Sequence, residues 1–170
     1  KPKEALPFLD RAIEIDPEGP DGYGNRGVIR SALQDGTGAL EDYDSALRLN
    51  PEFTEAYFNR GSLRAKNGEF AEAVADYSQV IFLTPQDAEA YLNRAGAYRG
   101  MGKAPSAIED LTKAMELGAK SAGVYNDRGV LRTGEGDRKG AIEDYTAAIQ
   151  CDSNYSRAYF NRGVLFQTSG

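Results

Sequence analysis

One polar side chain recurs along the chain at intervals of 34 residues, with a single change. The positions are Asn25, Asn59, Asn93, Asp127 and Asn161. A carboxamide carries both a donor and an acceptor, so it can pair with the N–H and C=O of one residue in an extended peptide without reading its side chain. We therefore predict a ladder of side chains that holds a peptide backbone. The alternative is that each asparagine bonds to neighbouring backbone or faces water, which is the common fate of polar helical residues.

Asp127 interrupts this column. An ionised carboxylate accepts hydrogen bonds but donates none. We expect this position to favour an amide N–H or a lysine of the partner instead.

A second pair of columns carries opposite charges. An arginine follows each member of the first column, at Arg26, Arg60, Arg94, Arg128 and Arg162, and sixteen residues after the first four stand Asp42, Asp76, Asp110 and Asp144. An arginine can bury its stem while its guanidinium makes charge-assisted bonds, whereas an unpaired buried charge is costly. We predict an arginine–aspartate pair inside each 34-residue unit. The alternative pairs each aspartate with the arginine of the next unit, 18 residues on, and the role is structural in both cases.

Composition excludes several kinds of chemistry. The chain has no histidine and one cysteine, so neither the common metal sites nor a catalytic triad can be assembled, and we expect no catalytic residue, metal or cofactor. Cys151 shares a column with Ile15, Leu49, Leu83 and Leu117, which predicts an apolar packing residue rather than a nucleophile.

Net charge and hydropathy narrow the class of partner. The net charge of −6 argues against nucleic acid, because phosphate binding needs clustered lysine and arginine, and it suits a neutral or basic partner. No apolar run approaches the roughly 20 residues of a membrane span, so no membrane partner is expected. Nothing in the sequence indicates a compartment, and the cytoplasm is the default expectation.

The elements that position these columns follow the same period. Tyrosines recur every 34 residues at Tyr23, Tyr57, Tyr91, Tyr125 and Tyr159. A fixed period of this length is typical of a stacked repeat array, in which each unit buries its apolar face against its neighbours. Within residues 54–87, apolar residues follow helical spacing up to Asn67-Gly68 and again from Phe70 to Leu83, so each unit is predicted to be two helices, A and B.

Prolines and small residues mark where the helices end and touch. Pro17, Pro51 and Pro85 predict the ends of three B helices, and Pro7 predicts that the opening helix begins close to it. Two columns of small residues should let helices A and B of a unit approach closely. They are Gly27, Gly61, Ala95, Gly129 and Gly163 in the first and Ala39, Ala73, Ala107 and Ala141 in the second.

The chain is predicted to be one all-α domain over residues 1–170. Its full repeats span 20–53, 54–87, 88–121 and 122–155, with a helix B alone in 1–19 and a helix A alone in 156–170. We expect a segment of a longer protein; a second hypothesis is head-to-tail self-association, in which one molecule's tail completes another's head. In a single chain, Leu165 and Phe166 would face the position of the absent helix B.

Together the period and the tyrosine, glycine, alanine and proline columns resemble the tetratricopeptide repeat family over essentially the whole chain. The resemblance implies a right-handed α-solenoid whose concave wall is formed by the A helices, with partners bound there as extended peptides or helices. Similar asparagine ladders line the repeats of O-linked N-acetylglucosamine transferase. Residues that the resemblance places on this wall, besides the asparagine column, include Glu55, Phe58, Glu89 and Leu92.

The family's two-carboxylate clamp is not expected here, because Gly24, Phe58, Leu92 and Phe160 stand where its first lysine should be. The leading functional hypothesis is a non-enzymatic adaptor that binds a segment of a partner protein. The alternatives are a substrate-recruiting or regulatory array attached to an enzyme domain, and a self-assembling solenoid.

Overall fold

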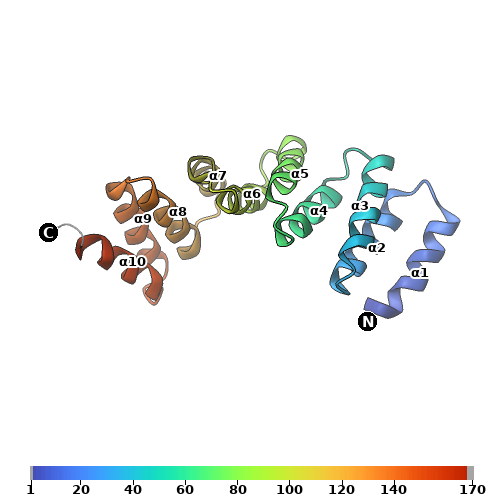
Figure 1. The fold of residues 1–170 in the computed structure, drawn as a ribbon, viewed down its shortest axis with the longest axis horizontal. Coiled ribbons are helices and arrows are strands. Elements are labelled where there is room, and N and C mark those ends of the chain that lie inside the picture. Colours follow the sequence, from blue (N-terminus) through green and yellow to red (C-terminus); the bar gives the residue numbers. More distant parts are fainter. Residues whose placement is uncertain (1, 168–170) are drawn as a thin grey trace. The chain divides into compact units, whose positions relative to one another are not determined.

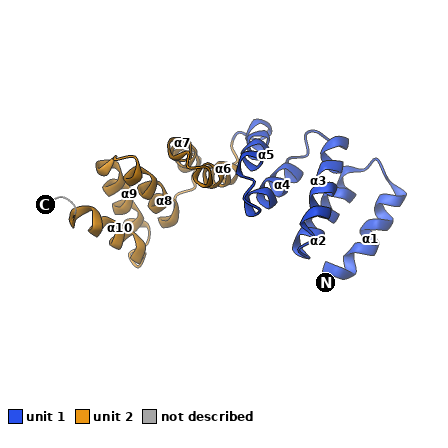
Figure 2. Cartoon of the chain, viewed as in Figure 1, with its two compact units in different colours: residues 1–85 blue, residues 86–170 orange. Residues whose placement is uncertain are grey.

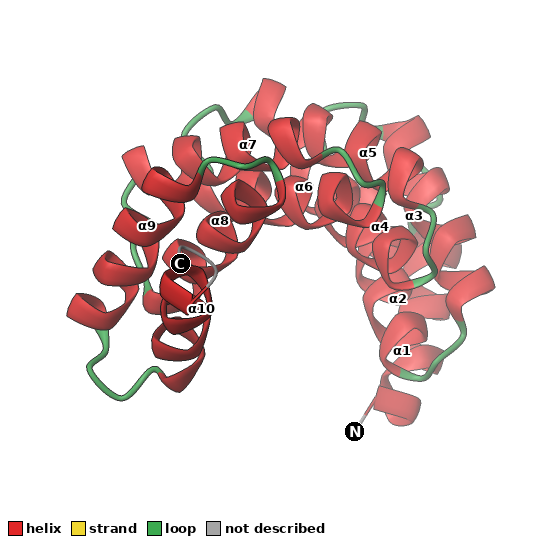
Figure 3. Cartoon of the chain, turned by 60° about the vertical axis from the view of Figure 1, so that its left-hand side comes forward, coloured by secondary structure: helices red, strands yellow, loops and turns green. Residues whose placement is uncertain are grey.

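The computed structural model describes residues 2–167, which contain ten α-helices and no strand (Figures 1 and 3). In chain order these are α1 (Pro2–Ile15), α2 (Pro20–Ala32), α3 (Gly36–Leu49), α4 (Thr54–Lys66), α5 (Phe70–Leu83), α6 (Ala88–Gly100), α7 (Ala104–Glu116), α8 (Ala122–Gly134), α9 (Arg138–Cys151) and α10 (Ser156–Gln167). The predicted all-α fold of helix pairs is confirmed.

The chain divides into two compact units, residues 1–85 and 86–170 (Figure 2). Within the first unit, α2 packs on α3 and α4 packs on α5, while α1 packs on α2. Within the second, α6 packs on α7, α8 on α9, and α10 on α9. Each full repeat is therefore one helix pair, with neighbouring pairs stacked inside a unit.

Helix ends follow the turn chemistry of the sequence. The helices α1, α3 and α5 each end two residues before a proline, as predicted. Pro7 is different, because α1 begins at Pro2 and runs through it. Proline there removes one backbone hydrogen bond of the helix. Its ring lies on an exposed face of α1, so it meets no neighbouring helix.

The core of each helix pair is a small residue against a large one. A Cβ added to Gly27 would lie 2.7 Å from Cε1 of Tyr43, and Gly129 stands in the same relation to Tyr145. In the third repeat, Ala95 and the smaller Leu111 belong to one buried cluster. The alanine column is fully buried as well. Burial, with a smaller contribution from neighbouring Asp42, raises the pKa of Tyr43 to about 12.

Each predicted arginine–aspartate pair forms within its own repeat. Arg60 Nε and Nη2 donate to the two carboxylate oxygens of Asp76 at 3.0 and 2.6 Å. The same two-pronged geometry joins Arg26 to Asp42, Arg94 to Asp110 and Arg128 to Asp144. These four aspartates are almost fully buried. The hydrogen bonds raise the pKa of Arg26 and Arg94 above its usual value, against the opposing effect of burial.

A second arginine joins three of these pairs, which sequence reasoning missed. Nη1 of Arg30, Arg64 and Arg132 lies 2.8–3.0 Å from the aspartate of its repeat. The signal was present, since these residues stand four positions after the first arginine in three repeats. In the third repeat the corresponding residue is Tyr98, whose ring lies 5.8 Å from the guanidinium carbon of Arg94.

The first arginine also reaches the preceding B helix. Arg26 Nη1 donates to Asp10 and Arg60 Nη1 to Asp44, at 2.7 and 2.6 Å. Arg128 and Arg162 donate in the same way to Thr112 and Thr146. All four partners lie 16 residues before the arginine, so the contact between repeats differs from the 18-residue alternative. Within each unit, the arginine thus ties consecutive repeats together.

Two sequence predictions about packing are wrong. Cys151 is exposed, because it is the last residue of α9, and its column is only partly covered elsewhere: Leu49 is half-buried and Ile15 is exposed. Leu165 is buried, because its face of α10 packs on the preceding repeat, in a cluster with Ala141 and Tyr145. Phe166 is exposed.

Candidate binding surface

The first unit carries a groove between helices α2 and α4. Two adjoining cavities of about 190 and 290 Å³ share Val28 and Asn59 as lining residues. The smaller one is also lined by Asp21, Gly24, Asn25, Phe53, Glu55 and Ala56. The larger one is completed by Ser31, Ala32, Tyr43, Ser62, Leu63 and Lys66.

Two asparagines of the predicted ladder lie in this groove without a partner. Asn25 is exposed and Asn59 is half-buried, and both line the smaller cavity. Among residues 2–167, neither carboxamide makes a hydrogen bond to another protein group. Each therefore offers a donor and an acceptor to whatever occupies the groove.

Charge is distributed unevenly along the groove. Asp21 and Glu55 line the smaller cavity, and both are exposed. Lys66 lines the larger cavity, with Ser31 and Ser62. The acidic part favours a cationic or neutral group, and the lysine favours an acceptor at the other cavity.

Phe53 shapes the groove, and sequence reasoning missed it. A Cβ on Gly24 would lie 2.8 Å from Cε1 of Phe53, so this ring occupies the space that a side chain at position 24 would take. The available signal was the glycine itself, which replaces the large residues Phe58, Leu92 and Phe160 of its column.

The other members of the asparagine column are engaged. Asn93 Nδ2 donates to the backbone oxygen of Glu89 at 2.9 Å, one turn back on α6. Asn161 Nδ2 donates to Oδ1 of the buried Asn126, also at 2.9 Å. An oxygen of Asp127 lies 3.6 Å from Nη1 of Arg99. With Asn25 and Asn59, the column therefore has four local environments, although its spacing is uniform.

The other residues predicted for the concave wall also differ in burial and in their neighbours. Phe58 is half-buried and packs edge-on against Tyr77, with ring centroids 5.8 Å apart. Leu92 is half-buried beside the core of the third repeat. Glu55 faces the groove of the first unit, while Glu89 is exposed in the first turn of α6.

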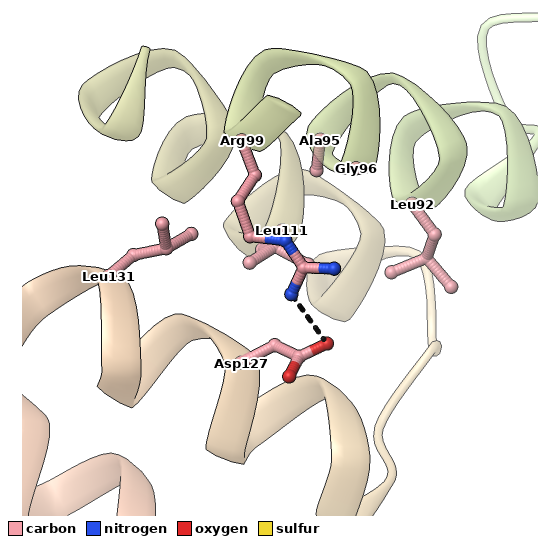
Figure 4. Close-up of a pocket in the computed structure, with 7 residues that line it drawn as sticks. All are labelled: Leu92, Ala95, Gly96, Arg99, Leu111, Asp127 and Leu131. Carbon is pink, nitrogen blue, oxygen red and sulfur yellow. Dashed lines mark ion pairs between the residues drawn. The ribbon is translucent and has the colours of Figure 1, made fainter. Parts of the chain in front are cut away.

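The second unit has a smaller pocket of its own, of about 100 Å³ (Figure 4). Helix α6 contributes Leu92, Ala95, Gly96 and Arg99, α7 contributes Leu111, and α8 contributes Asp127 and Leu131. The lining is apolar apart from the ion pair of Arg99 with Asp127.

The described residues offer neither a metal site nor a membrane-spanning helix. Over residues 2–167, no three histidine, cysteine, aspartate or glutamate side chains are grouped so that they could hold a metal ion. In the same range, no helix has both the length and the apolar character needed to cross a membrane.

Within each unit, successive helix pairs stack on one another at a constant period. This arrangement defines an α-solenoid protein. The family model for the tetratricopeptide repeat matches residues 25–88 and 58–122, more than half of the chain, and the chain belongs to this family. Members of the family are in general non-catalytic modules that bind other proteins.

Several solved structures share this fold. MamA from Desulfovibrio magneticus RS-1 superposes with a TM-score of 0.83 at 25% identity, covering 91% of this chain and 87% of the other. YrrB, described as having an unusual peptide-binding site, has a TM-score of 0.84 at 21% identity, with 94% and 82% covered. PilF of Pseudomonas aeruginosa has a TM-score of 0.81 at 21% identity, with 98% and 76% covered. No curated protein matches the chain.

Proposed function

We propose that this chain is a non-catalytic adaptor that binds an extended segment of a partner protein, with Asn25 and Asn59 holding the segment's backbone. The observation that carries the proposal is that both carboxamides line one groove of the first unit and make no hydrogen bond to the described residues. A partner's backbone would satisfy them with little reorganisation of the protein.

The groove also suggests the character of the segment. A carboxamide pairs with backbone groups of any residue, so the two asparagines give affinity with little sequence preference. Asp21 and Glu55 add a preference for a neutral or basic residue beside them. Phe58 lines neither cavity of the groove, and its ring packs against Tyr77, so we expect it to contribute less than Asn25 and Asn59.

The second unit carries its own members of the column, Asn93, Asp127 and Asn161, which would contact a partner segment bound within that unit. There each side chain would exchange its present partner for the peptide. To bind the peptide, Asn93 would lose its hydrogen bond to the backbone oxygen of Glu89 in α6. We therefore expect Asn25 and Asn59 to contribute more to affinity than the second-unit members do.

A display library of random short peptides tests the proposal. Peptides are selected on the native chain, and their affinity is compared for the native chain and the double variant Asn25→Ala/Asn59→Ala. Each lost hydrogen bond contributes about 0.5–1.5 kcal/mol, so the loss of one bond from each asparagine should weaken binding about 5- to 150-fold. Thermal unfolding should barely change, because neither side chain holds the fold together.

The matched control is Asn67→Ala/Asn154→Ala, which removes two exposed asparagines outside the groove. It should leave affinity unchanged. Equal affinity of the native chain and the groove variant would refute the asparagine ladder, and failure to select any peptide would refute the adaptor function.

A further inference from the structure

We propose that the pocket of the second unit, between α6, α7 and α8, receives one aliphatic side chain, of about the size of valine or leucine, from an extended partner segment bound to that unit. This inference rests on the proposed function and adds a sequence preference to it. The pocket combines apolar walls, a position without a side chain, and a donor–acceptor pair beside it (Figure 4).

The lining and the volume of the pocket indicate which kind of partner side chain it can hold. Leu92, Leu111 and Leu131 converge from three helices, and Figure 4 shows their side chains around one space. The volume of about 100 Å³ exceeds the roughly 30 Å³ of a water molecule and is smaller than the about 150 Å³ of a cavity that binds benzene. An aliphatic side chain of the size of valine or leucine fits these limits.

Gly96 leaves the space open. The same column holds Val28, Val130 and Val164, with Ser62 in the second repeat. A Cβ built on Gly96 would meet no atom within 4 Å, so no packing constraint requires glycine there. Glycine inside a helix is less favourable than any other residue except proline. The residue therefore weakens α6 and leaves room for a ligand.

Arg99 and Asp127 supply the polar part of the site. The guanidinium of Arg99 points to the Asp127 carboxylate across the pocket, at 3.6 Å, and both side chains are about half exposed (Figure 4). An exposed ion pair of this kind contributes little to stability, so a ligand can separate it at little cost. Arg99 can then donate to a peptide carbonyl while Asp127 accepts from the next N–H. The pair thereby offers the two functions that a single asparagine offers at Asn25 and Asn59.

Substitution of Gly96 tests the site with peptides selected from the random library on the native chain. Gly96→Val places the side chain of three other repeats into the pocket, and Gly96→Met fills it with a flexible chain that favours helix. The control is Gly134→Val, at a helical glycine whose Cβ would likewise meet no atom. Loss of one buried aliphatic side chain corresponds to about a 10-fold or greater change in affinity. We expect that loss for both Gly96 variants and unchanged affinity for the control.

Alanine scanning of a selected peptide completes the test. One aliphatic residue should lose about 10-fold in affinity for the native chain when replaced by alanine, and little for Gly96→Val, since the pocket is already filled. If Gly96→Val and Gly96→Met both bind as well as the native chain, or no aliphatic position matters, the pocket assignment is wrong. The adaptor proposal would still stand in that case, because Asn25→Ala/Asn59→Ala reports on it separately, in the other unit.

Discussion

The arginine–aspartate clusters show how one side chain type can serve a repeated fold. A buried carboxylate is tolerated because it accepts from two guanidinium groups in the first, second and fourth repeats. The stems of these arginines cover apolar surface, and Arg26 and Arg60 also lie over the rings of Tyr23 and Tyr57. The first arginine of each repeat is thus part of the packing, as its spacing from aspartate indicated.

Replacing these aspartates by asparagine should lower the free energy of unfolding by unequal amounts. Asp76→Asn leaves Arg60 and Arg64 facing a group that cannot balance them, so we expect a loss of about 2–4 kcal/mol in the free energy of unfolding. Asp110→Asn should cost less, because Tyr98 stands in place of the second arginine. Urea denaturation of the two variants measures the difference, and equal losses would contradict the two-arginine account.

The turns between helices A and B depend on backbone conformation. Gly68, Gly102 and Gly136 have positive φ values of 70–84°, and the equivalent residue of the first repeat, Gln34, has a φ of 66°. Glycine adopts this region without strain, whereas a residue with a Cβ does so at a cost of about 1–2 kcal/mol. The sequence predicted these turns from Asn67-Gly68, but it gave no sign that glutamine adopts the same conformation in the first repeat.

Exchanging the two residue types should shift stability in opposite directions. Gln34→Gly relieves the strain, and we expect a gain of about 1 kcal/mol in the free energy of unfolding. Gly68→Gln should lose a similar amount, since its Cβ would meet no atom and only the backbone term changes. Denaturant midpoints measure both, and a destabilised Gln34→Gly protein would show that its side chain has an unrecognised role.

For the molecule as a whole, head-to-tail association remains a hypothesis with a specific weakness. If α1 of a second copy followed α10 as a B helix follows an A helix, Phe8 would stand where Asp42, Asp76 and Asp144 stand in their repeats. Arg162 would then face a phenyl ring instead of the carboxylate that each preceding repeat provides. The cost of burying an unpaired guanidinium opposes such an interface.

We therefore expect a monomer at every concentration in a light-scattering series on the native chain. A mass that rises with concentration would favour self-association. Phe8→Asp then serves as the matched variant, since it restores the missing carboxylate and should strengthen that association if the geometry is right.

The period, the helix pairs and the arginine–aspartate partners could be read from the chain because each repeats at a constant spacing. Residues 16 apart on paired helices meet in every full repeat, so the same spacing predicted all four arginine–aspartate pairs. Other properties depend on side chains contributed by helices distant in sequence. The free carboxamides of Asn25 and Asn59, the bond from Asn161 to Asn126 and the pocket at Gly96 are all of this kind. A column assigns the same position to every repeat, but the neighbours that decide pairing and burial differ from one repeat to the next.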